Sequence, residues 1–163
     1  MKIGILSDTH GILDDEVLDF FSECDEIWHA GDIGNIEIID TLSSISVVRV
    51  VYGNIDGQPA RSSFPEFQMF SIGLLRVLMT HIAGKLPAYN QKVRSYIQEH
   101  QPSILVCGHS HILKVIFDRK NNLLFINPGA AGNHGFHKVK TALRFQIIDD
   151  KPAKMEILEL KRH

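Results

Sequence analysis

Six short apolar segments in this chain end directly in glycine and polar residues, and this pattern limits the folds that the chain can adopt. Segments of this length that are rich in Val and Ile are typical of buried strands. In an open α/β sheet, the residues that follow the strands gather outside the carboxyl ends. We therefore expect one site built from distant parts of the sequence. The segments are 2–6, 26–30, 46–52, 74–79, 103–107 and 123–126.

Other stretches of the chain complete the expected order of elements. Apolar residues recur at helical spacing over 14–24, 36–45 and 88–100. The stretch 56–67 has the composition of a loop, and Gly73 joins 68–72 to 74–79 as in a hairpin. The remaining strands follow without an intervening helix, over 103–107, 113–118, 123–127, 142–148 and 153–160.

The first half of the sequence therefore has the alternation of a doubly wound sheet, and the second half looks antiparallel. Two mixed sheets packed face to face, with helices outside, accommodate both patterns. A length of 163 residues fits one domain with its own core. We predict the α/β class and a single domain over 1–163.

Composition excludes several classes of partner. The 17 basic and 19 acidic residues give a net charge of -2, so no broad positive field attracts extended nucleic acid or an anionic membrane. The apolar start of the chain is too short for a signal peptide. Cys24 and Cys107 belong to no spaced framework, and we expect a cytoplasmic protein. Nine histidines are unusual for this length and suggest a metal site or proton transfer.

The polar residues at the ends of the expected strands are of the types that bind transition metals. Carboxylate, carboxamide and imidazole ligands without thiolate suit Mn, Fe, Zn, Co or Ni. Seven ligands exceed what one tetrahedral ion takes, but two ions that share a carboxylate can use them all. We also expect D-x-H and H-x-H to aim alternate side chains of an extended chain at one place. The predicted ligands are Asp8, His10, Asp32, Asn54, His81, His109 and His111.

In order along the chain, the motifs D-x-H, G-D, G-N-x-D, T-H and G-H-S-H resemble those of the calcineurin-like metallophosphoesterases, particularly the small YfcE-type members. The resemblance implies a four-layer α/β/β/α sandwich with two metal ions, for which manganese is our first expectation. It implies one ion held by Asp8, His10, Asp32 and His111. It implies a second ion held by Asp32, Asn54, His81 and His109, with Asp32 as the bridge.

The resemblance also implies an activity: hydrolysis of a small phosphodiester by in-line attack of a metal-bound hydroxide, with Asp32, Asn54 and His81 as the catalytic residues. Many relatives have a histidine after the G-N asparagine, but this chain has Ile55, which cannot donate a proton. Poor leaving groups should therefore react slowly. A protein-interaction scaffold of the same fold, like the retromer subunit, is the alternative, although Asn54 favours the enzyme. An oligomer is compatible with both readings.

Other residues near these motifs are candidates for supporting roles. We expect His29 to be structural, and Asp56 either to orient a ligating histidine or to be a surface turn residue. The glycine-rich loop 127–138 either supplies His134, His137 or Lys138 to the substrate or is a solvated loop.

Overall fold

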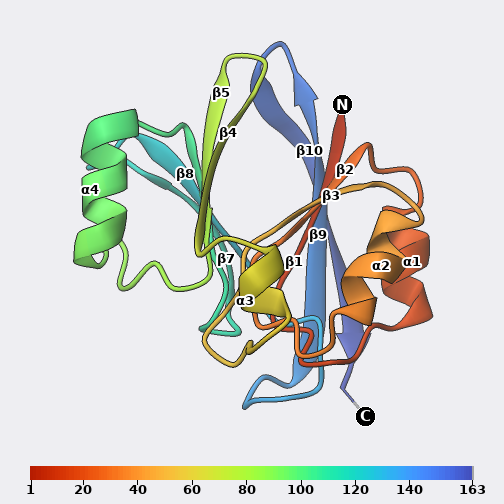
Figure 1. Cartoon of the computed structure of the whole chain (residues 1–163). Helices are drawn as coiled ribbons and strands as arrows, with labels where there is room; N and C mark the ends of the chain where they lie inside the picture. Colours follow the sequence, from red (N-terminus) through yellow and green to blue (C-terminus); the bar gives the residue numbers. More distant parts are fainter. Residues whose placement is uncertain (163) are drawn as a thin grey trace.

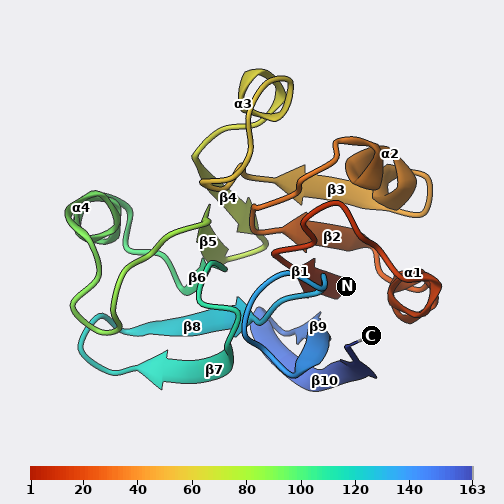
Figure 2. The same cartoon turned by 90° about the horizontal axis from the view of Figure 1, so that it is seen from below.

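Two five-stranded sheets pack face to face in the computed structural model, which describes residues 1–162 (Figure 1). The helices α1 (Asp15–Phe21) and α2 (Glu37–Ser43) cover the outer face of one sheet, and α4 (Gln91–His100) covers the outer face of the other. The short α3 (Ala60–Ser63) lies at the edge where β3 and β4 meet (Figure 2). This arrangement confirms the four-layer α/β/β/α sandwich of two mixed sheets.

The first sheet has the strand order β10-β9-β1-β2-β3. Its three parallel strands come from the start of the chain, and its two antiparallel strands come from the end. The strands are β1 (Lys2–Leu6), β2 (Glu26–His29), β3 (Val47–Val50), β9 (Val139–Ile148) and β10 (Lys151–Lys161).

The second sheet has the order β4-β5-β6-β8-β7, with parallel strands in its centre and antiparallel strands at both edges. The strands are β4 (Phe67–Ile72), β5 (Leu75–Thr80), β6 (Ile104–Val106), β7 (Leu113–Asp118) and β8 (Leu123–Pro128). The antiparallel appearance of the second half of the sequence is thus confirmed for β7 with β8 and for β9 with β10, but not for β6 and β8, which are parallel. The helix α4 serves as the crossover that makes β5 and β6 parallel, and spacing within single strands does not reveal such pairing.

The stretch 56–67, which we expected to be a loop from its composition, contains a short helix. This helix, the four-residue α3, is too short for apolar residues to repeat with a helical period.

The layer between the two sheets forms one of the apolar cores. The Trp28 ring lies 5.1 Å from that of Phe70 in the opposite sheet and 6.0 Å from that of Phe145 in its own, both in edge-to-face geometry. Ile3 and Ile5 point into this layer, while Leu6 packs under the outer helices. This core fixes the separation of the sheets, and with it the positions of the loops at their carboxyl ends.

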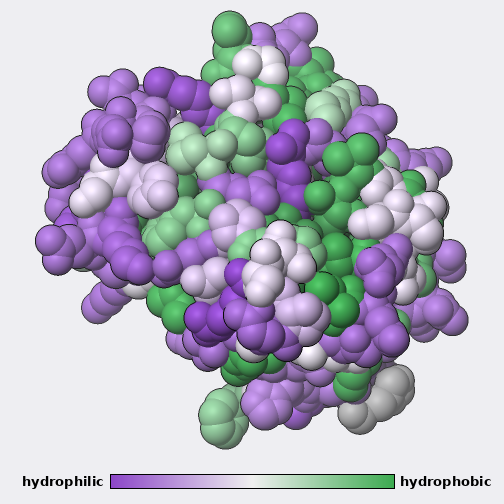
Figure 3. All heavy atoms as spheres, in the orientation of Figure 1, coloured by the Kyte–Doolittle hydropathy of each residue, from purple (hydrophilic) through white to green (hydrophobic). Residues whose placement is uncertain are grey.

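The outer helices bury only one side. In α4 the buried side consists of Val93 and Ile97, and the surface over this helix is predominantly hydrophilic (Figure 3). None of the helices in residues 1–162 has the length and apolar character needed to cross a bilayer.

We predict that Leu143→Ala lowers the free energy of unfolding by about 2–5 kcal/mol, because it removes a side chain that is fully buried between the sheets. Leu74→Ala is the matched control, since Leu74 is 81 % exposed, and it should change stability by less than about 0.5 kcal/mol. Urea unfolding measures both values. Equal values for the two variants would contradict the inter-sheet core as the main source of stability.

Candidate metal centre

The loops after four strands bring carboxylates and imidazoles from both sheets together. Two groups form, and within each group one ligand atom from every residue lies within 4.8 Å of the others. Asp8 and His10 follow β1, Asp32 follows β2, His81 follows β5, and the remaining histidines follow β6. The first group is Asp8, His10 and His111, and the second is Asp32, His81 and His109. The two histidines of H-x-H therefore belong to different groups.

Asp32 faces histidines of both groups. Its Oδ1 lies 3.2 Å from His81 Nε2, and its Oδ2 lies 3.6 Å from His10 Nε2. This is the disposition that a carboxylate needs if it is to contact two cations. The backbone N–H of Ile55 donates a hydrogen bond to Oδ1 at 3.1 Å and holds the carboxylate in place.

Asp8 ties the two sheets together at this site. Its Oδ2 accepts a hydrogen bond from the backbone N–H of His109 at 3.0 Å, which joins the loop after β1 to the loop after β6. Its Oδ1 lies 3.1 Å from His111 Nε2 and 3.8 Å from His81 Nε2, without hydrogen-bond geometry.

Three buried polar atoms that face one another have no hydrogen-bond partner among residues 1–162: Asp8 Oδ1, His10 Nε2 and His81 Nε2. A buried polar atom left unpaired costs about 1–3 kcal/mol, so three of them at one point need an explanation. Divalent cations would satisfy all three. The Nδ1 of His81 lies 2.7 Å from the carbonyl oxygen of Ala30, so that nitrogen carries the proton and Nε2 presents its lone pair. The residues therefore fit a transition-metal centre.

The electrostatics of the site favour charged carboxylates. Burial alone would raise the pKa of Asp8, but the imidazoles of His10, His111 and His81 outweigh it and hold this pKa well below its usual range. For Asp32, burial is likewise outweighed, here by His81, and the pKa is lowered. Both carboxylates are therefore anionic near neutral pH, which is the form that binds cations.

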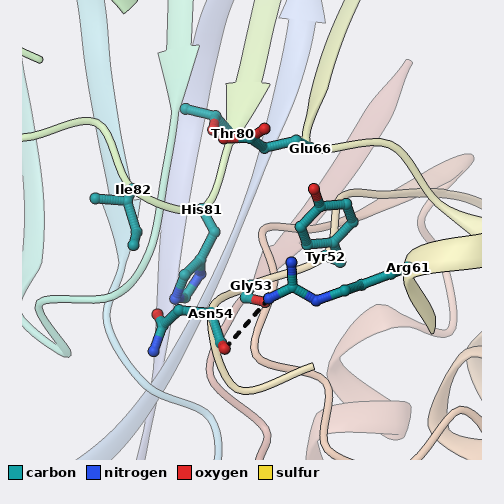
Figure 4. A pocket seen from close by; sticks show the side chains of 8 residues that line it. All are labelled: Tyr52, Gly53, Asn54, Arg61, Glu66, Thr80, His81 and Ile82. Atoms are coloured by element: carbon teal, nitrogen blue, oxygen red, sulfur yellow. Dashed lines mark hydrogen bonds between the residues drawn. The ribbon is translucent and has the colours of Figure 1, made fainter. Parts of the chain in front are cut away.

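Asn54 stands at the edge of the second group, where it lines a cavity together with His81. Figure 4 shows its carboxamide beside the His81 imidazole. All seven residues predicted as ligands therefore lie in one region of the molecule.

The backbone at the predicted ligands is not extended, so the expected alternation of side chains in D-x-H and H-x-H was wrong. Five of the seven residues have a positive φ, a region that residues other than glycine rarely adopt. Each lies in a loop where the chain leaves its sheet, so turns aim these side chains. The angles are 55° for Asp8, 47° for His10, 54° for Asp32, 70° for His109 and 58° for His111.

Two glycines before the predicted ligands have no room for a side chain. A Cβ on Gly108 would collide with the hydroxyl of Ser7 and lie 2.7 Å from Asp8 Oδ2, and one on Gly53 would collide with the carboxylate of Asp32. Glycine therefore lets these loops approach the carboxylates closely.

Asp56 is neither a surface residue nor a partner of a histidine ring, contrary to both expectations. It is buried, and its carboxylate accepts hydrogen bonds from the backbone N–H groups of Gly53 at 2.8 Å, Gly34 at 3.0 Å and Ile33 at 3.1 Å. Through these hydrogen bonds, Asp56 links the loop that contains Asp32 to the loop that contains Asn54.

His29 contacts the loop after β1 through a hydrogen bond to Thr9. Its Nδ1 accepts a hydrogen bond from Gly31 N–H, so its Nε2 carries the proton and donates to Thr9 Oγ1 at 3.0 Å. Complete burial lowers the pKa of His29 to about 4, so this imidazole is neutral. Its placement agrees with a structural role.

The loop 127–138 reaches the first group through two histidines. The His134 ring lies 4.7 Å from that of His10, and the His137 ring lies 5.2 Å from that of His111. His137 Nε2 also lies 2.8 Å from the carbonyl oxygen of Gly132. The loop therefore lies beside the first group, and its contact with the substrate stays a prediction. Lys138 is exposed.

Sequence reasoning missed Arg61, which comes from the unpredicted helix α3. Its guanidinium stacks on Tyr52 at 4.5 Å and donates hydrogen bonds to the carbonyl oxygens of Asp56, Gly53 and Asn54 (Figure 4). It therefore orients the turn that presents Asn54. A lone arginine in a loop carries no sequence signal for such a role.

The chain matches known proteins over most of its length. The family model described as the calcineurin-like phosphoesterase superfamily domain matches residues 1–150. A probable metallophosphoesterase of Methanocaldococcus jannaschii is 31% identical over 136 residues, which cover 80% of this chain and 68% of that protein. A phosphodiesterase of the same organism is 25% identical over 146 residues, which cover 79% of this chain and 83% of that protein.

The fold also occurs in a solved structure from a eukaryote. Wild-type Vps29 of Entamoeba histolytica, complexed with Zn²⁺, superposes with a TM-score of 0.77. The match covers 100% of both chains at 18% sequence identity, so it shows a shared fold.

We predict that Asp56→Asn weakens Mn²⁺ binding by about 10–100-fold, because the amide group cannot accept all three backbone hydrogen bonds that position Asp32 and Asn54. Isothermal titration calorimetry measures the affinity. Asp40→Asn, which changes an exposed aspartate of α2, is the control and should keep the original affinity. An unchanged affinity in Asp56→Asn would show that these hydrogen bonds do not organise the site.

Proposed function

Since the chain belongs to the calcineurin-like phosphoesterase superfamily, we propose that it is a phosphodiesterase that uses two divalent metal ions. The observation that carries the proposal is the set of buried, unpaired atoms of Asp8, His10 and His81, which face one another beside Asp32. The similarity to a phosphodiesterase of Methanocaldococcus jannaschii supports diesters as the substrate class.

We assign the ligands by the two groups and by the position of Asp32 between them. One ion would be held by Asp8, His10, Asp32 and His111, and the other by Asp32, Asn54, His81 and His109. Manganese is the ion that we expect, and the nitrogen and oxygen ligand set also suits Fe, Zn, Co or Ni. The Zn²⁺ in the Vps29 structure supports the capacity of this fold to hold such ions.

When bound, two divalent ions would stabilise negative charge on the phosphate and lower the pKa of a coordinated water. The chain's own residues prepare the site for this chemistry. Asp8 and Asp32 supply two negative charges, fewer than the four positive charges of the ions, so the loaded site retains an attraction for an anionic diester. Asn54 and His81 line the adjoining cavity, where they can orient the phosphate.

Proton donation to the leaving group is not available from Ile55. Its aliphatic side chain is 47 % exposed, and only its backbone N–H takes part in the site, through Asp32. General-acid assistance is worth about 10²–10⁴-fold, so diesters with good leaving groups should be hydrolysed faster than alkyl diesters.

A scaffold that binds proteins is the second candidate, because the fold is shared with Vps29, a protein named for vacuolar protein sorting. The complete set of seven ligand residues favours the enzyme. Metal content and diester turnover, measured on the same preparation, separate the two functions. A folded protein that holds no metal and hydrolyses no diester would favour the scaffold.

We also propose a cytoplasmic location. Cys24 and Cys107 are both free and buried in the structure, which agrees with a reducing compartment.

We predict that Asp32→Asn lowers hydrolysis of bis(p-nitrophenyl) phosphate in Mn²⁺ by more than about 100-fold. Residues that merely orient a metal ligand cost about 10–100-fold, and Asp32 is proposed to contact both ions. The asparagine oxygen can still accept the Ile55 hydrogen bond, so the loop should keep its shape. Release of p-nitrophenolate measures the rate.

The control for this experiment is His100→Ala, at the exposed end of α4, which should retain the original rate. Removal of metal with a chelator should abolish turnover, and added Mn²⁺ should restore it. Full activity of Asp32→Asn would refute the proposed bridging role of Asp32. Full activity after chelation would refute the proposed dependence on metal ions.

A further inference from the structure

A cavity of about 200 Å³ adjoins the second group of ligands, and the metal site alone does not explain its lining. One end is formed by Asn54, His81 and Arg61, and the opposite end by Thr80, Glu66 and the hydroxyl of Tyr52, whose ring lies against Arg61 (Figure 4). The cavity is smaller than the roughly 300–1,000 Å³ of pockets that enclose drug-sized ligands. It therefore suits a phosphoryl group together with one small substituent.

The end near Asn54 suits the phosphoryl group. Two nitrogens of Arg61 are used for the carbonyl oxygens of the Asn54 turn, while its Nη1 makes no hydrogen bond within residues 1–162. The guanidinium charge beside Asn54, together with the free Nη1 donor of the same group, attracts phosphate oxygens.

The opposite end is rich in oxygen atoms with unused hydrogen-bonding capacity. Neither the Tyr52 hydroxyl nor the Thr80 hydroxyl has a hydrogen-bond partner in the described part of the chain, and the Tyr52 hydroxyl points toward Glu66 and Thr80 (Figure 4). The Glu66 carboxylate contacts Lys92 Nζ at 3.0 and 3.1 Å, which leaves further acceptor positions on both of its oxygens.

The charges at this end select among possible substituents. Lys92 neutralises Glu66, so neither a carboxylate nor an ammonium group gains much from this ion pair. Arg61 covers one face of the Tyr52 ring, which removes that face as a platform for an aromatic group. A neutral group with several hydroxyls, such as glycerol or a sugar, satisfies the three oxygen-bearing side chains.

We propose that this cavity binds the hydroxylated alcohol of the substrate, so that Tyr52 and Glu66 make the protein selective for phosphate esters of polyols. The inference rests on the proposed function for the position of the phosphate. Tyr52 and Glu66 act in binding and specificity, at a distance from the groups that hold the metal.

The test compares three phosphate esters that differ only in the substituent: glycerol 3-phosphate, propyl phosphate and ethanolamine phosphate. Isothermal titration calorimetry with the full chain in Mn²⁺ gives each Kd. We expect glycerol 3-phosphate to bind at least about tenfold more tightly than propyl phosphate, as hydrogen bonds to charged or hydroxyl partners allow. Tyr52→Phe, which keeps the ring under Arg61, and Glu66→Gln should each reduce this ratio by several-fold.

Glu99→Gln on α4 is the matched control, because Glu99 is exposed and lies outside the cavity, and it should keep the ratio. The proposal is overturned by equal affinities of the wild-type protein for the glycerol and propyl esters, by a ratio that both cavity variants retain, or by no measurable binding of either ester. Tightest binding of ethanolamine phosphate would also overturn it, in favour of a cationic substituent.

Hydrolysis of bis(p-nitrophenyl) phosphate, which has no hydroxyl groups, tests the proposed function separately. Selectivity for glycerol 3-phosphate without turnover would support the cavity and refute the phosphodiesterase. Turnover of this diester without selectivity for glycerol 3-phosphate would support the phosphodiesterase and refute the proposed role of the cavity.

Discussion

The arrangement of two buried carboxylates against several imidazole nitrogens is the interaction on which the rest of this structure depends. Asp8 and Asp32 are buried and anionic, and His10 Nε2 and His81 Nε2 beside them have no hydrogen-bond partner among residues 1–162. Charges removed from water are costly unless they are paired. The charges of the site therefore favour the binding of cations. The surrounding loops hold these groups together although their removal from water is unfavourable.

The two-sheet sandwich can bring these carboxylates and imidazoles together because each sheet supplies some of them. Asp8 and Asp32 follow strands of one sheet, and His81, His109 and His111 follow strands of the other. The core around Trp28 sets the distance between the sheets, while Asp56 and the Asp8–His109 hydrogen bond join the loops. Stability and site geometry are linked through the same inter-sheet packing.

The fold by itself does not decide what the site does. The likeness to Vps29 at 18% identity extends over both complete chains, so one backbone arrangement is shared by proteins with different residues at corresponding places. The loops of this chain carry the chemistry that bears on this question: seven residues of metal-ligand type, an isoleucine where a proton donor would help, and a small polar cavity beside Asn54. Our proposal assigns substrate choice to these side chains.

The sequence alone determined the fold class, the family and the strand ends that carry the polar residues, because short apolar segments and residue spacing are local properties. It could not determine that β5, β6 and β8 are parallel or that β9 and β10 complete the first sheet, since strand pairing depends on contacts between distant residues. Nor could it reveal the left-handed turns at the predicted ligands, the three hydrogen bonds that Asp56 accepts from backbone N–H groups, or the place of Arg61 against Tyr52. These features form only when loops that are distant in the sequence come into contact, so they are determined by the tertiary structure.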